Sequence, residues 1–435
     1  MLLENLDRYK LSTTKAAVTS FAGLPMVMGM GKSLGLEEAL NRLPLKERER
    51  GYSPAESIFS LMGLIQAGGV ALDDISLLQG DEGLRELWGD VPASNTLGET
   101  LRRFGGTTVY RLAEVIGQAV VKVIRAKGLK RVTLDIDALM VESQKADVAM
   151  NYEGEWGYCP VMVSCAELKM PVAGLFRPGN ASPMANLAGL LRRVIAVLKA
   201  EFPTLEIIVR SDSAGYQAKV VRVCEDAKVH FTITARKDEA VMETIRSNPK
   251  RGWRKYKAPA YPHKKTEIAE TVHAFGDKDL SSYRLIVLRW PKEERDLFDA
   301  DPYAYHAVMT DQEGRAELVM QFHRNRQDKS ENVNKEQVGG FALSKLPCRS
   351  LLANAAYFQI SILAHVVFAA FKHLALPESW QTATIKTVRF RMIRLAGIVS
   401  RRARALWLKI PEGYPYLRVF EEAHWATLGA RVWAT

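Results

Sequence analysis

Residues 130–142, KRVTLDIDALMVE, alternate apolar and polar side chains with a period of two, the pattern of a β-strand with one buried face. Asp135 and Asp137 lie two positions apart, so on a strand both carboxylates point to the same side of the sheet. A buried carboxylate is costly unless a metal ion or another cation compensates its charge. The segment predicts either a metal site at a strand end or an acidic pair in a turn. Asp137 is the first candidate ligand because it is nearer the strand end, and Asp135 is the second.

The alternation continues beyond this strand and then gives way to helical spacing. We expect three antiparallel strands, then a helix, a strand, a second helix and a last strand. These are predicted within residues 130–142, 156–168, 171–179, 184–203, 205–212, 216–228 and 230–238. The succession βββαβαβ over residues 129–237 is the outline of an RNase H-like fold, and the predicted fold class is therefore mixed α/β.

Two further acidic residues occupy comparable positions. Asp212 follows the apolar run LEIIV, and Glu331 opens a long helical segment near the C-terminal end of the chain. Two divalent ions about 3.5–4 Å apart can hold the attacking and leaving oxygens of a phosphoryl transfer, and hard carboxylate oxygens are the ligands that Mg²⁺ accepts. The simpler alternatives are a helix cap at Asp212 and a surface ion pair between Glu331 and Lys335.

The flanking regions predict five units in all. Ser53-Pro54 with Glu56 predicts a helix start, Gly68-Gly69 predicts its end, and Ser94 or Asn95 is expected to cap a later helix. We expect a helical N-terminal domain for DNA binding or dimerisation at 1–128, the first part of the core at 129–237, a mostly β insertion at 238–320, the second part of the core with basic helices at 321–410, and a C-terminal tail at 411–435.

The charge of the chain favours a polyanionic partner. Its 435 residues contain 60 Lys and Arg against 49 Asp and Glu, a net charge of +11, and such a surface attracts nucleic acid by counterion release. Seven basic residues are concentrated near the C-terminal end: Arg389, Arg391, Arg394, Arg401, Arg402, Arg404 and Lys409. We expect them on helices that contact DNA phosphates, with a solvated helix as the alternative.

Other features exclude several classes of protein. The four cysteines have no zinc-ligand spacing and are expected to be buried thiols in a reducing cytoplasm. The apolar run at 350–371 contains Asn354, Gln359 and His365, so we expect a buried helix and no membrane partner. Neither a GxxxxGK[ST] phosphate loop nor a GxSxG nucleophile elbow is present.

Seven stretches carry a resemblance to a known family: SFAGLPMV, GYSPAESIFSLMGLIQAGG, LDDISLLQGDEGLRELWG, SNTLGETLRRF, VTLDIDAL, RSDSAGY and ENVNKEQ. In this order, over roughly residues 15–410, the chain resembles the DDE transposases of bacterial insertion sequences and is most similar to the IS thirteen-eighty group. Three departures from the family pattern are Ala138 and Leu139 after the first Asp, an extra Ala214 after the second, and one additional residue before Glu331.

The resemblance implies that Asp137, Asp212 and Glu331 are the catalytic triad and hold two Mg²⁺ ions, for which Mn²⁺ can substitute. It implies cleavage of double-stranded DNA at terminal inverted repeats, strand transfer into target DNA, a homodimer on DNA, and a location in the bacterial cytoplasm at the nucleoid. The residues expected to contact DNA are Arg326, Lys335, Arg236, Lys237, Arg401, Arg402 and Arg404. The alternatives are a catalytically inactive DNA-binding protein descended from a transposase, and a structure-selective nuclease without strand transfer.

Overall fold

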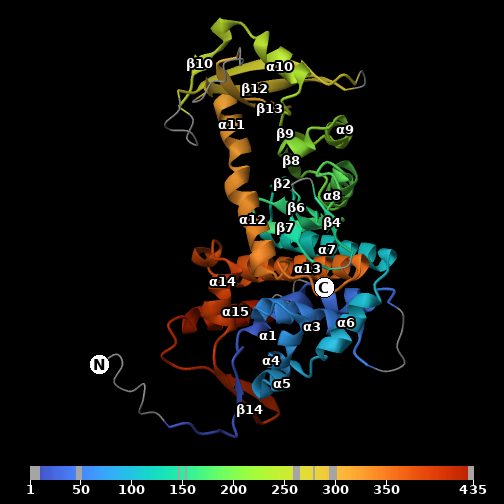
Figure 1. The fold of residues 1–435 in the computed structure, drawn as a ribbon. Helices are drawn as coiled ribbons and strands as arrows, with labels where there is room; N and C mark the ends of the chain where they lie inside the picture. Colours follow the sequence, from blue (N-terminus) through green and yellow to red (C-terminus); the bar gives the residue numbers. More distant parts are fainter. Residues whose placement is uncertain are drawn as a thin grey trace.

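A nine-stranded sheet forms the centre of one half of the molecule, and a helical assembly forms the other half (Figure 1). The computed structural model describes residues 10–45, 51–145, 147–151, 154–257, 265–277, 280–292 and 301–429, apart from the side chains of 327–330. The predicted mixed α/β class is confirmed.

The strands of the large sheet follow the order β10-β11-β12-β13-β9-β8-β2-β6-β7. Their bounds are β2 (Arg131–Ala138), β6 (Val161–Cys165), β7 (Met170–Leu175), β8 (Glu206–Ser211), β9 (His230–Thr234), β10 (Arg254–Lys255), β11 (Glu267–Ala274), β12 (Ser282–Pro291) and β13 (Tyr303–Thr310). Strands β2, β6 and β7 are antiparallel, whereas β8 is parallel to both β2 and β9. Helices α8 (Leu187–Glu201) and α9 (Ala218–Ala227) connect β7 to β8 and β8 to β9. Within the large sheet, the order along the chain therefore follows the predicted succession, whereas three further short strands were not expected. A small separate sheet contains β3 (Val141–Glu142), β4 (Ala149–Met150) and β5 (Trp156–Tyr158).

The region predicted as a β insertion continues the same sheet. Strand β13 pairs with β9 in antiparallel register, from Val308 opposite Thr234 to Thr310 opposite Thr232. Strands β10 to β13 therefore extend the sheet beyond β9. Helix α10 (Glu239–Arg246) was not expected in this region; the Asp238 side chain caps it by accepting from the Val241 backbone N–H.

The helical half contains the predicted N-terminal helices α1 (Leu24–Ser33), α2 (Leu36–Asn41), α3 (Pro54–Ala67), α4 (Ile75–Gln79), α5 (Glu82–Trp88), α6 (Ser94–Arg102) and α7 (Gly106–Lys127). Ser53 and Glu56 form the expected capping box of α3, and Gly68 ends that helix with a left-handed φ of 95°. The expected cap of α6 is wrong by one or two positions, because the helix begins at Ser94 and Ala93 is its N-cap.

The C-terminal part supplies α11 (Ala316–Arg324), α12 (Arg326–Gly340), α13 (Leu351–Ala375), α14 (Ile385–Val388) and α15 (Leu417–Gly429). Helices α11 and α12 run nearly end to end from the β10–β13 part of the sheet to α13 (Figure 1). Helix α13 has the length and composition of a membrane span, but 89% of its most apolar window is buried inside the protein. It packs against α1, α3, α7, α15 and β7, which confirms the expected buried helix.

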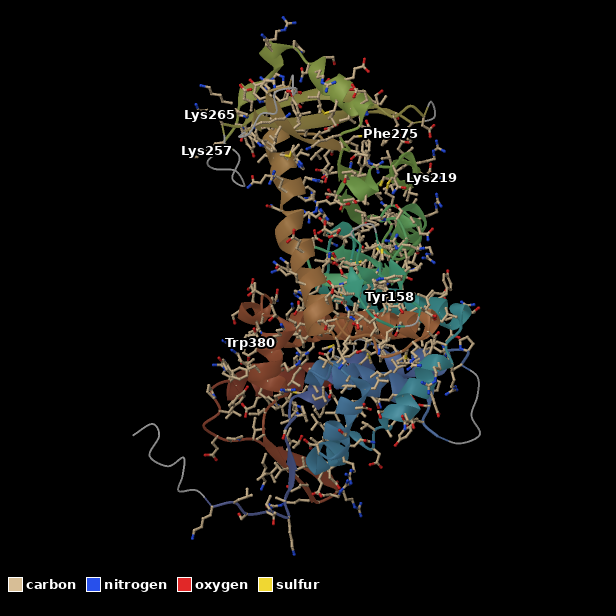
Figure 2. The ribbon with its side chains drawn as sticks, viewed as in Figure 1. Tyr158, Lys219, Lys257, Lys265, Phe275 and Trp380 are labelled. Atoms are coloured by element: carbon tan, nitrogen blue, oxygen red, sulfur yellow. The ribbon has the colours of Figure 1, made fainter. Side chains whose placement is uncertain are left out.

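Polar groups fix α13 in this position. The Asn354 side-chain amide donates to the hydroxyl of Tyr158 (3.2 Å), a residue labelled in Figure 2 where the sheet meets α13. The Gln359 amide donates to the Gly174 carbonyl on β7 (2.9 Å). These bonds satisfy buried polar groups that would otherwise destabilise an apolar helix.

The expectation of helix up to about residue 409 is wrong. Residues 397–409 form a β-hairpin of β14 (Gly397–Arg402) and β15 (Ala405–Lys409), and β14 also pairs with β1 (Ala17–Thr19). A strand nearly four hundred positions away in sequence supplies the pairing partner, so tertiary context overrides the helical spacing. All four cysteines are buried and free, as predicted.

Candidate functional site

Asp137 and Asp212 lie side by side at the same edge of the sheet. Parallel pairing places Asp135 opposite Arg210 and Ile136 opposite Ser211, so the next step along each strand is Asp137 on β2 and Asp212 just after β8. Adjacent strands are about 4.8 Å apart. The Asp212 carboxylate accepts from the Ala214 backbone N–H through Oδ1 (2.9 Å) and caps the short turn at Ser213–Gly215. The cap expected as the alternative for Asp212 is therefore confirmed, and its place beside Asp137 is compatible with a role as a metal ligand.

Helix α12 packs over this edge. The Asn334 side-chain amide donates to Asp137 Oδ2 (2.9 Å), and the Arg326 guanidinium lies 3.4 Å from the same oxygen. The Asp137 and Arg326 side chains are 19% and 15% exposed. The predicted DNA contact Arg326 is therefore a partner of the first candidate catalytic carboxylate in this structure.

Glu331 lies one helical turn before Asn334, so its Cβ is about 5–6 Å from that of the residue touching Asp137. Its carboxylate is about half exposed and pairs with the Lys335 ammonium (3.2 Å). The structure therefore places Glu331 on the helix that covers the acidic pair, with its side chain in the surface ion pair foreseen as the alternative.

The sequence suggested a metal ion as the partner of Asp135, but in the structure its partner is an arginine. Its two carboxylate oxygens accept from Arg210 Nε (2.6 Å) and the second guanidinium nitrogen of Arg210 (2.8 Å), and both side chains are fully buried. Burial raises the pKa of the Asp135 carboxyl, and Arg210 opposes that effect. A protein cation thus compensates this carboxylate, and we leave Asp135 out of the proposed ligand set.

Arg210 also links β2 and β8, which carry the two aspartates, to α11, the helix that precedes α12. Besides Asp135 on β2, it donates to the Phe322 carbonyl near the end of α11 (2.7 Å) and stacks on the Phe322 ring. Arg210 itself belongs to β8, two residues before Asp212. Neither Arg210 nor Asn334 was expected at the site, although each lies two or three positions from a candidate carboxylate.

A second buried chain of hydrogen bonds holds the segment after Asp212. The Tyr216 hydroxyl is 2.8 Å from His273 Nε2, and His273 Nδ1 is 2.9 Å from the Thr244 hydroxyl. Burial lowers the pKa of His273, which favours the neutral form of its ring. The loop behind Asp212 is therefore anchored to β11 and α10.

The other predicted DNA contacts are distributed over the surface. Arg236 and Lys237 are exposed just after β9, and Arg401, Arg402 and Arg404 lie at the end of the β14–β15 hairpin. Arg389 is partly buried and Arg394 is exposed. Both donate to main-chain carbonyls at the C-terminal end of α3, Arg389 to those of Ile65 and Gln66 and Arg394 to that of Ala67. A Cβ on Gly68 would lie 2.8 Å from Arg389 Cδ, so this close approach requires glycine.

The chemistry of Asp137 and Asp212 fits a hard divalent ion, since both offer carboxylate oxygens at adjacent strand ends. Within the part of the chain that the structure describes, no three His, Cys, Asp or Glu side chains gather closely enough to hold a metal ion. The third candidate, Glu331, directs its carboxylate to Lys335 in this structure.

The fold and the acidic pair define a mixed α/β protein with a candidate acidic centre at the ends of two parallel strands. The family model described as transposase DDE domain group 1 matches residues 6–428, and the chain belongs to this family of transposases. Among solved structures, the chain is similar to the piggyBac transposase in a synaptic complex with hairpin DNA, determined by cryo-electron microscopy. That likeness has 12% identity and a TM-score of 0.46, covering 87% of this chain and 83% of the other. A comparison with curated proteins finds no match.

Proposed function

We propose that this transposase cleaves double-stranded DNA at terminal inverted repeats and joins the ends to target DNA by two-metal-ion phosphoryl transfer. The observation that carries the proposal is the parallel register of β2 and β8, which brings Asp137 and Asp212 together under α12. Membership of the DDE family supports the same reaction class. The narrower assignment to the IS thirteen-eighty group rests on the sequence stretches given above.

The strand arrangement supports an RNase H-like core. Within the large sheet, the order β7-β6-β2-β8-β9 has an antiparallel meander on one side of β2 and two parallel strands on the other. In such a sheet the central strand and its parallel neighbour end at the same edge. The proposed site lies at that edge, and β10 to β13 widen the sheet away from it.

The proposed roles follow from the positions of the side chains. Two Mg²⁺ or Mn²⁺ ions would be held by the three carboxylates: Asp137 would serve both ions, and Asp212 and Glu331 would each hold one. When bound, such ions activate the attacking water or DNA 3′-hydroxyl and stabilise the leaving oxygen. Asn334 orients the Asp137 carboxylate through its amide.

Glu331 reaches this site by a side-chain rotation in the proposed active state. It lies one helical turn from Asn334, and in the part of the chain that the structure describes its carboxylate is held by a surface ion pair with Lys335, a kind of contact worth about 0.3–0.5 kcal/mol. The rotation releases Lys335 to bind a DNA phosphate. Arg326 pairs with Asp137 in this structure and would become available for the same purpose if Asp137 held metal ions. Arg236 and Lys237 are already exposed.

The test is a cleavage assay of the purified protein with Mg²⁺ and labelled DNA carrying the ends of its own genomic neighbourhood. Asp137→Asn, Asp212→Asn and Glu331→Gln are each expected to lower cleavage by more than about 100-fold, since each removes a ligand of a catalytic ion. DNA binding, measured in Ca²⁺, is expected to stay within a few fold. The matched control is Glu421→Gln, which removes an exposed carboxylate from α15.

Near-normal cleavage by any of the three variants would remove that residue from the triad. Tight DNA binding by the wild-type protein without cleavage in Mg²⁺ or Mn²⁺ would instead favour the catalytically inactive DNA-binding protein. Cleavage without joining would favour the structure-selective nuclease. Analytical ultracentrifugation of the protein with DNA tests the homodimer that we propose for the active complex.

A further inference from the structure

The β14–β15 hairpin and β1 form a small sheet with two different faces. On the inner face, Val399 is buried and the Arg401 guanidinium pairs with Glu86 on α5 (3.2 Å). The hairpin is therefore fastened to the helical half through one face. In Figure 1 it lies at the end of the molecule opposite the β10–β13 strands, beyond α1 to α6 as seen from the acidic site.

The outer face combines apolar and basic side chains in register. Cross-strand pairs point to the same side of a sheet, and the pairs here are Val18 with Ile398, Ile398 with Lys409, and Ser400 with Trp407. Trp407 is 57% exposed and Ile398 is 46% exposed. Since apolar side chains this large are usually covered, the outer face has the character of a binding surface.

The turn of the hairpin carries Arg404 and is flanked by Arg402. Ala403 and Arg404 occupy the two turn positions with φ values of 47° and 65°, a left-handed conformation that favours glycine or asparagine. Two residues with a Cβ in such positions carry a conformational cost, and strain of this kind is often retained where a side chain is needed. Here the turn places Arg404 at the apex, next to Arg402.

The positive charge on this surface favours a polyanion as its binding partner. Arg402, Arg404 and Lys409 are exposed, and none has an ion-pair partner among the described residues. A second copy of the same face would bring these like charges together, whereas a polyanion would neutralise them. A two-stranded ribbon also fits the major groove of duplex DNA, which is about 12 Å wide.

We propose that the β14–β15 hairpin is a DNA-reading ribbon that enters a groove of the duplex well away from the acidic site. Arg402 and Arg404 contact phosphates or base edges, and Trp407 packs against the sugar-phosphate backbone beside them. The proposal rests on the proposed function, because it assumes a DNA substrate. It adds a second contact region, which anchors the internal part of the bound DNA while the cut end lies at Asp137 and Asp212.

A substitution of Arg401 distinguishes a specific contact of the hairpin with DNA from an effect of total charge alone. Its guanidinium is held by Glu86, so Arg401→Gln should weaken DNA binding less than Arg402→Gln or Arg404→Gln. All three substitutions remove one charge from the same hairpin, and only the last two remove a cation without an ion-pair partner.

The test uses the full chain and a fluorescein-labelled duplex of mixed sequence that is long enough to span the molecule. The Arg402→Gln/Arg404→Gln double variant is expected to raise Kd by about tenfold or more. It should also lower the slope of log K against log salt by up to about 1.8, or about 0.9 per phosphate contact. The matched control, Lys219→Gln/Lys228→Gln, removes two charges at α9, on the side of the sheet away from α12, where Figure 2 labels Lys219.

Hydrogen–deuterium exchange provides a readout independent of these variants. Binding of the duplex should slow exchange in residues 397–409 of the wild-type protein. If Kd, the salt slope and exchange were all unchanged, the proposal of a DNA-binding ribbon would be overturned. A double variant that changes only the oligomeric state would also overturn it and would indicate that a second copy of the chain occupies this face. Wild-type protein that binds through the hairpin without cleaving DNA would leave the ribbon intact and contradict the proposed reaction.

Discussion

Asp135 and Asp137 are two residues apart on β2, and the protein uses their carboxylates differently. Arg210 takes both oxygens of Asp135 inside the core, whereas Asp137 lies near the strand end and meets α12 through Asn334. The difference arises from depth in the sheet. A carboxylate in the middle of a covered strand needs a partner of fixed geometry, whereas one at the edge can exchange partners.

This contrast predicts opposite phenotypes for the two aspartates. Asp135→Asn leaves Arg210 buried with a neutral partner, so we expect the free energy of unfolding to fall by about 3–5 kcal/mol. Asp137→Asn should leave that free energy within about 0.5–1 kcal/mol of wild type while abolishing cleavage. Urea denaturation followed by tryptophan fluorescence measures both.

The control for Asp135 is the double variant Asp135→Leu/Arg210→Met. It removes both charges together, and such replacements of buried ion pairs are often neutral or stabilising. Recovery of stability without recovery of cleavage would show that the Arg210 contacts position the site. A stable Asp135→Asn protein would contradict the assigned role of the pair.

The alternation of residues 130–142 could predict an acidic strand end. It could not predict which of the two aspartates has its charge compensated by a buried cation. Alternation gives Asp135 and Asp137 the same face, and both look equally available in sequence. The deciding partner, Arg210, comes from a parallel strand seventy-five positions later, and its register depends on the whole sheet. Long-range pairing of this kind leaves no local signal.

At the scale of elements, α11 is fixed to the sheet through a buried histidine. His323 Nδ1 and Nε2 lie 2.9 Å from the hydroxyls of Thr232 and Thr234 on β9. Burial lowers the pKa of His323 well below its usual value, and the nearby charges of His306, Arg326 and Arg210 act in the same direction. Burial also lowers the pKa of His306, to about 4.

The two histidines predict acid sensitivity of this contact. Because their folded pKa values are below the unfolded value of about 6.5, the unfolded chain binds more protons as pH falls from about 6.5 toward 4, and stability is lost over that window. The thermal midpoint should therefore decrease between pH 7 and pH 5. His323→Asn, which cannot gain this charge, should show a shallower decrease than wild type.

His424 supplies the matched comparison, since it is exposed on α15. His424→Asn should leave the pH profile unchanged. A wild-type profile that is flat between pH 7 and pH 5, or one equally steep in His323→Asn, would contradict the assignment of the acid-sensitive contact to α11.

Elements with local signals were predictable and those with distant partners were not. The capping box and terminal glycine of α3 identify that helix from its own residues. The β14–β15 hairpin, by contrast, has helical spacing in its own sequence, and its pairing partner β1 lies nearly four hundred positions earlier in the chain. The extension of the sheet by β13 is a similar case, since only the three-dimensional register connects it to β9.

At the scale of the whole molecule, described segments from early and late in the chain pack together in the helical half. Strand β1 pairs with β14, and α15 packs against α1 and α13. The Ser33 hydroxyl near the end of α1 donates to the Thr427 carbonyl of α15 (3.4 Å). The segment predicted as a C-terminal tail is thus part of the helical half that holds the N-terminal helices.

This arrangement predicts a large stability effect from a single residue of α15. Phe420 is buried and Trp425 is 69% exposed on the same helix. Phe420→Ala should lower the free energy of unfolding by about 3–5 kcal/mol through loss of packing and creation of a cavity. Trp425→Ala should change it by no more than about 0.5 kcal/mol.

Limited proteolysis locates the effect within the molecule. In Phe420→Ala, cleavage should increase in residues 24–45 of the N-terminal helices, which lie far from the substitution in sequence. Equal stability of the two variants, or increased cleavage confined to α15, would show that the C-terminal helix is an accessory to the fold.

The pairing of β1 with β14 also sets the order of events during synthesis. Thr19 leaves the ribosome long before Gly397, its partner in the sheet, and at about 5–20 residues per second the interval is on the order of tens of seconds. Until then β1 lacks its strand partner β14, and a prematurely terminated product never acquires it. Incomplete chains should therefore be removed by cellular proteases rather than persist as competitors for DNA. Force measurements on stalled nascent chains should detect completion of this sheet only after β14 has emerged.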